Sequence, residues 1–153
     1  MPKPLSPEYL RELRPTWRRH WLQALFEFAN PSLQRRSWVE ASVDHVSCYV
    51  ECLSEYFSGL VTEDEYAMVL EQGLISSSEV AAVLDFHRLA ISYRPPQGEI
   101  ENAVAILEDP LWHEVVQRAQ RTWHNLKELV SEEERGFMAS LEAKWGQPST
   151  PTN

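Results

Sequence analysis

The sequence predicts an all-α fold: a single-domain bundle of six or seven helices, with a central helix at about residues 79–93 that is apolar almost all round. Three observations predict it. Helix-starting and helix-ending residues recur along the whole chain, and no segment alternates apolar and polar residues for long enough to indicate a strand. The length of 153 residues, 43% of them hydrophobic, suits one domain with one core. We expect this helical domain to span residues 1–146 and residues 147–153 to form a disordered tail.

Each predicted helix begins at a capping residue or a proline. The first begins at Ser6-Pro7, and because its apolar stripe stays in phase across Pro15, we expect one kinked helix. The second begins at Asn30-Pro31 and ends at Gly59. Five further helices are expected. The third runs from the capping box 62–65 to Gly73, and the fourth runs from the capping box 76–79 to just before Pro95-Pro96. The fifth covers about 99–107, the sixth starts at Asp109-Pro110, and the last runs from Ser131 to Gly146.

Two of these helices are expected to build the core. The helix after Asp109 places its apolar residues within about 100° of arc, so it should face inward along one stripe. That stripe is Trp112, Val115, Val116, Ala119, Trp123, Leu126 and Val130. The helix at 80–93 has apolar residues on both sides, which predicts a central position with neighbours on each side. His87 lies in the middle of its main apolar face, where we expect a hydrogen-bonded core histidine.

Charge is distributed unevenly along the chain. The net charge is −9, but residues 1–38 carry seven basic and three acidic residues, and the remainder carries seven basic and twenty acidic. Residues 37–87 hold ten acidic residues and no Lys or Arg, which predicts a coherent negative field. This sign disfavours nucleic-acid binding. The arginines near the N-terminus are expected to pair with the protein's own acids or to be solvated, and a dimer of basic end against acidic face is the alternative.

The segment 38–57, treated as one continuous helix, divides into three sectors. The first is an acidic stripe of Glu40, Asp44, Glu51 and Glu55. The opposite sector, expected to be buried, is Val39, Val43, Val46, Val50, Leu53 and Phe57. Between them lie Ala41, His45, Cys48, Tyr49, Cys52 and Tyr56.

This acidic stripe is the candidate binding site. Like charges four residues apart on a helix destabilise it by a few tenths of a kcal/mol per pair, so stability alone would favour bases there. We expect the four acids to attract a basic protein, with Tyr49 and Tyr56 as exposed contact residues. A merely solvated face on an acidic protein is the plain alternative.

No constellation of catalytic or metal-binding residues emerges. His45, Cys48 and Cys52 span seven positions, about 10 Å along a helix, which is too far for one metal ion. A Cys48–His45 nucleophile pair is disfavoured because nearby carboxylates raise the pKa of a thiol. No histidine has an acid three positions before it, and the glycines are too dispersed for a phosphate loop. We therefore expect no metal, no cofactor and no enzymatic activity.

The chain begins Met-Pro-Lys-Pro without a following apolar run, and its longest apolar runs are five residues. Both features predict a protein without signal peptide or membrane helix, located in the cytoplasm. Two cysteines are too few for a disulfide framework, and reduced thiols are expected.

In overall character, which is small, acidic, helical and without an active-site motif, the chain is similar to the immunity proteins that bacteria use against nuclease toxins such as colicins. This likeness is one of class, covers no motif and assigns no residue. It implies a non-enzymatic inhibitor that neutralises a basic toxin by occluding the surface where that toxin binds its anionic substrate. The alternatives are a helical enzyme or small-ligand-binding protein with a pocket near His87 and Tyr93, and a structural or regulatory homodimer.

Overall fold

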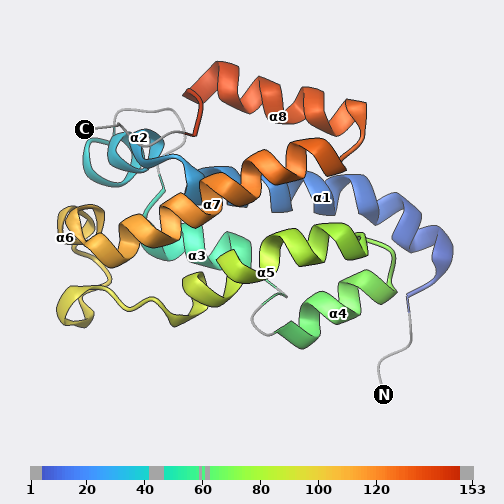
Figure 1. Cartoon of the computed structure of the whole chain (residues 1–153), viewed down its shortest axis with the longest axis horizontal. Helices are drawn as coiled ribbons and strands as arrows, with labels where there is room; N and C mark the ends of the chain where they lie inside the picture. The colour runs from blue at the N-terminus through green and yellow to red at the C-terminus, as the bar shows by residue number, and fades with distance from the viewer. Residues whose placement is uncertain (1–4, 42–46, 59, 61–62, 149–153) are drawn as a thin grey trace.

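A computed structural model describes residues 5–41, 47–58, 60 and 63–148. In these residues it contains eight α-helices, one π-helical segment and one 3-10 turn, and no strand, which confirms the all-α class (Figure 1). The elements are α1 (Pro7–Ala29), α2 (Pro31–Gln34), η1 (Arg35–Val39, the π-helix), α3 (Tyr49–Phe57), α4 (Glu63–Glu71), α5 (Ser77–Ser92), η2 (Pro96–Gly98, the 3-10 turn), α6 (Ala103–Glu108), α7 (Pro110–Leu129) and α8 (Glu132–Trp145).

Helices α1 and α7 pack against each other through the middle of the molecule (Figure 1). Helix α8 packs along α1 on one side, and α3 packs along α1 elsewhere. Helix α5 packs against α7 and also against α4. Within the part of the chain that the structure describes, no helix combines the length and the apolarity needed to cross a bilayer.

The core is densest where α1 and α7 meet. All seven residues of the predicted α7 stripe are buried, as expected. The second half of α1 is enclosed almost completely, with Leu22, Leu25 and Phe28 at 0% exposure. Helix α5 buries Val83, Phe86, His87 and Ala90, but Ile91 remains 36% exposed. The most enclosed helical segment is therefore the second half of α1 rather than α5.

Most of the predicted helix boundaries are confirmed by explicit caps. The hydroxyl of Ser6 accepts from the N–H of Tyr9 at 3.1 Å, and Ser76 forms a complete capping box with Glu79. α1 runs through Pro15 as one helix. α8 starts after the N-cap Ser131. Gly73 and Gly146 have φ of 77° and 95°, the left-handed region that favours glycine. The predicted boundaries at Gly59 and Thr62 lie outside the described residues.

The prediction of one helix from residue 31 to residue 58 is wrong. After the single turn α2, the backbone widens into η1, and Ala41 then takes a φ of 50°, which a right-handed helix does not permit. Helix α3 begins at Tyr49, after Cys48, whose backbone is extended. The Ser37 hydroxyl accepts from the N–H of Ser47 at 2.6 Å and so holds the start of the described segment 47–58 against η1.

The end of α8 is tied back to the start of α2 and to η1. The Asn30 side chain donates to the carbonyl of Gly146 at 3.1 Å, and Arg36 donates to the carbonyl of Trp145 at 2.8 Å. Gln147 and Pro148 follow without helix, and Pro148 is buried. The rest of the predicted tail, residues 149–153, lies outside the described residues.

Candidate functional site

The two tyrosines predicted as exposed contact residues on α3 are buried, so that prediction is wrong. Tyr49 is 3% exposed and Tyr56 is 1% exposed, and they lie with Cys52 on the face of α3 that meets the core. Val50, expected to be buried, is 39% exposed. The non-helical backbone at Ala41 and at Cys48 removes the helical phase that a continuous wheel assumes.

The four acidic residues of the candidate site do not lie together on one helix. Glu51 and Glu55 lie four residues apart on α3 and are exposed, and Glu40 is exposed directly after η1. Asp44 lies outside the described residues. The structure therefore brings Glu51 and Glu55 together on one helix face, whereas Glu40 belongs to another segment.

No Lys or Arg of the described residues forms an ion pair with Glu40, Glu51 or Glu55. The described ion pairs all join other residues. They are Arg18 with Glu79 and Glu134, Arg19 with Glu133, Arg88 with Glu63 and Asp85, Arg118 with Asp85, and Lys127 with Glu142. The acids of α3 thus remain uncompensated by the described part of the molecule.

A hollow of about 680 Å³ lies between α1 and the C-terminal half of α3. Leu13, Thr16, Trp17 and His20 line it from α1, and Ser54 and Glu55 line it from α3. This volume lies within the usual range of binding pockets. Among the described lining residues Glu55 is the one carboxylate, and these residues include no Lys or Arg; Glu55 belongs both to this hollow and to the acidic face. Sequence reasoning missed the hollow because it depends on how α1 and α3 pack.

A chain of buried hydrogen bonds lies beneath this hollow. The indole N–H of Trp21 donates to the hydroxyl of Tyr66 at 3.0 Å, and this hydroxyl lies 2.6 Å from that of Tyr56. The Tyr56 hydroxyl is also 3.0 Å from Nδ1 of His87. Burial raises the pKa of both tyrosines, so they stay neutral. His87 is thus a hydrogen-bonded core residue, as expected.

The cysteines do not form a reactive site in the described structure. Cys48 is exposed and Cys52 is buried, and both are free. Burial, and after it the charge of Glu27, raises the pKa of the Cys52 thiol well above its ordinary value, opposite to what a nucleophile needs. No group of three or more potential metal ligands occurs among the described residues, and His45 lies outside them.

Glu27 is a half-buried carboxylate that sequence reasoning missed. It accepts hydrogen bonds from the Ser47 hydroxyl at 2.9 Å and from the Trp38 indole at 3.3 Å. Burial raises its pKa despite these bonds, and the negative charge of Glu55 raises it further. Its position between the buried Phe26 and Phe28 gives no sequence signal of this burial, because Gln23 lies between the buried Leu22 and Ala24 on the same helix and is exposed.

Arg18 holds α1 to α5 and α8 from inside the fold. It is 2% exposed and donates to both carboxylate oxygens of Glu79, to Glu134 and to the carbonyl of Leu74. Burial would raise the pKa of Glu79, but the hydrogen bonds and the charge of Arg18, together with hydrogen bonds from Ser76, outweigh it and hold that pKa below its usual value. One of the N-terminal arginines is therefore committed to the protein's own acids.

No family model, no curated protein and no solved structure matches this chain.

Proposed function

We propose that this protein is a non-enzymatic binding protein that docks the acidic face of α3 onto a basic protein, in the manner of an inhibitor or immunity protein. The observation that carries the proposal is that Glu51 and Glu55 are exposed, adjacent on one helix and without an ion-pair partner among the described residues. A pair of like charges at this spacing costs about 0.2–0.5 kcal/mol in the free helix, and a cationic partner would relieve that cost.

Electrostatic attraction of this kind mainly accelerates encounter and selects the partner's sign of charge. The buried tyrosines do not take part in the contact, so the apolar area must come from the neighbourhood of α3. Val50 is exposed on α3, and Leu13 and Trp17 line the adjacent hollow from α1. The partner would be neutralised by occlusion, because the carboxylates would occupy the cationic surface where it binds its own anionic substrate.

A binding measurement tests this proposal. The protein is immobilised, and the binding of basic nuclease domains of bacterial toxins is compared with that of neutral and acidic proteins of similar size. We expect selective binding to one or more basic domains, a steep loss of affinity as the salt concentration rises, and inhibition of nuclease activity by the bound protein. Binding that ignores both the charge of the partner and the salt concentration would contradict the proposal, as would binding to no basic domain.

A further inference from the structure

The hollow between α1 and α3 combines an aromatic surface with a carboxylate. Trp17 is half-buried, and its ring stacks on Trp21 with ring centroids 5.8 Å apart and an angle of 21° between the planes. Glu55 lines the same hollow from α3, and Leu13 adds an apolar surface. An indole ring and a carboxylate that line the same hollow are the chemistry that recognises a cation with an apolar stem.

Two arginines on the helix that carries Trp17 are directed to other residues. Arg18, on the same helix as Trp17, forms its hydrogen bonds with Glu79, Glu134 and Leu74. Arg14 donates to the carbonyl of Gly73 at 3.1 Å. The described residues that line the hollow include no arginine and no lysine.

The surroundings of the hollow are negative beyond Glu55 itself. The charge of Glu55 contributes to the raised pKa of Glu27, so these two carboxyl groups are near enough to interact. Glu51 lies one helical turn before Glu55 and is exposed on the same helix. A cation that enters the hollow thus meets one carboxylate directly and the field of two others.

We propose that this hollow receives an arginine side chain of the basic partner, an inference that rests on the proposed function and specifies it. The guanidinium stacks against Trp17 and pairs with Glu55, while the apolar stem packs on Leu13. Arginine fits better than lysine, because its planar and weakly hydrated guanidinium stacks on aromatic rings and forms directed bonds with a carboxylate.

The test uses N-acetyl-argininamide as the probe and N-acetyl-citrullinamide as its uncharged isostere. NMR titration of the whole chain should shift the indole N–H of Trp17 and the backbone amide of Glu55 with the arginine probe and not with the citrulline probe. Equal shifts with both probes, or shifts confined to other surfaces, would overturn the proposal.

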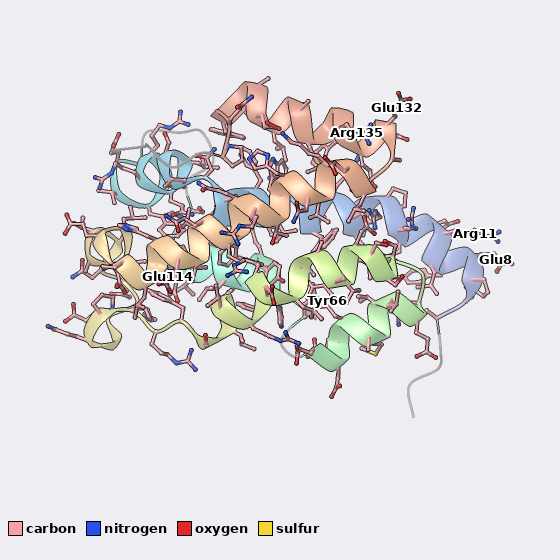
Figure 2. The ribbon with its side chains drawn as sticks, in the orientation of Figure 1. Glu8, Arg11, Tyr66, Glu114, Glu132 and Arg135 are labelled. Carbon is pink, nitrogen blue, oxygen red and sulfur yellow. The ribbon has the colours of Figure 1, made fainter. Side chains whose placement is uncertain are left out.

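Two pairs of variants locate the site. Thr16→Arg places a cation in the hollow, and Gln117→Arg makes the same change of charge at an exposed position on α7. Glu55→Gln removes the carboxylate, and Glu114→Gln is its control on α7 (Figure 2). We expect the first member of each pair to weaken binding of the arginine probe by about two- to fivefold, and the second member to leave that binding unchanged. Equal effects within each pair would overturn the assignment.

The same variants separate this inference from the proposed function. Suppose that a basic nuclease domain binds, and that Glu51→Lys weakens this binding while Thr16→Arg does not. The partner then docks on α3 without entering the hollow, and the proposed arginine site is wrong. If neither variant weakens it, both proposals are wrong. If both weaken it relative to Gln117→Arg, both are supported.

Discussion

Arg18 and Glu79 connect α1 to α5 through paired hydrogen bonds of 3.0 and 2.5 Å, and both residues are 2% exposed. Arg18 also bonds Glu134, so three helices meet at one guanidinium. This arrangement neutralises Glu79, one of the ten acids in the segment 37–87 that has no base of its own. Glu51 and Glu55 are not part of this arrangement, and they face solvent without an arginine partner among the described residues.

Replacing Arg18 by Met should destabilise the fold by about 3–5 kcal/mol, because it leaves Glu79 buried without its counter-charge. The free energy of unfolding in urea measures this loss. Arg19→Met is the matched control, since Arg19 is 58% exposed and its nearest carboxylate, Glu133, is 3.9 Å away. The control should change stability by less than about 1 kcal/mol. Similar losses for both variants would contradict the structural role of Arg18.

The stability that Glu79 contributes should depend on pH with a defined sign. Its pKa is lowered in the folded state from an ordinary value of 4.5, so the folded protein binds this proton less readily than the unfolded chain does. The contribution is therefore complete above pH 4.5 and is lost as the pH falls through the folded pKa. The difference in unfolding free energy between wild type and Glu79→Gln should shrink under acid conditions. A difference that is constant or grows on acidification would contradict this assignment.

Much of this fold follows from local chemistry that the sequence displays. Ser6, Ser76 and Ser131 cap their helices because a hydroxyl satisfies an otherwise unpaired N–H at a helix start. The stripe of α7 is buried as predicted because one helix with a single apolar face has only one way to turn inward.

The candidate site was harder to predict because it depends on the break before α3. Nothing in the residues 35–41 signals a π-helical turn, and Ala41 is an uncommon residue for a positive φ. Because the helical phase is not continuous from residue 38, Tyr49 is buried where exposure was predicted, and Val50 is exposed where burial was predicted. Glu51 and Glu55 are exposed in the structure, as they are in the predicted continuous helix, because charged side chains favour the surface in either arrangement.

The carboxyl of Glu27 should titrate above the ordinary value of 4.5, because burial raises its pKa. Carbon-detected NMR of this carboxyl measures the titration directly. Glu55→Gln should lower the pKa of Glu27, since the charge of Glu55 contributes to the shift. Glu114→Gln, on α7, is the control and should leave it unchanged. An unchanged pKa in Glu55→Gln would show that the two carboxyls do not interact.

Replacing Tyr56 by Phe should destabilise the fold by about 1–3 kcal/mol, because the Tyr66 hydroxyl and Nδ1 of His87 lose a buried hydrogen-bond partner. Thermal unfolding measures the loss. Tyr9→Phe is the matched control, because Tyr9 is 50% exposed. The control should have almost no effect, and a Tyr56→Phe protein as stable as wild type would contradict the hydrogen-bonded chain.

In the proposed function the acids of α3 attract a basic partner, and the rate of association with a basic nuclease domain is the direct measure of that attraction. Glu51→Lys/Glu55→Lys should slow association by about tenfold or more and flatten its dependence on salt. Glu114→Lys/Glu128→Lys makes the same change of net charge at exposed positions on α7 and should slow it much less. Equal slowing by both double variants, or by neither, would contradict docking through α3.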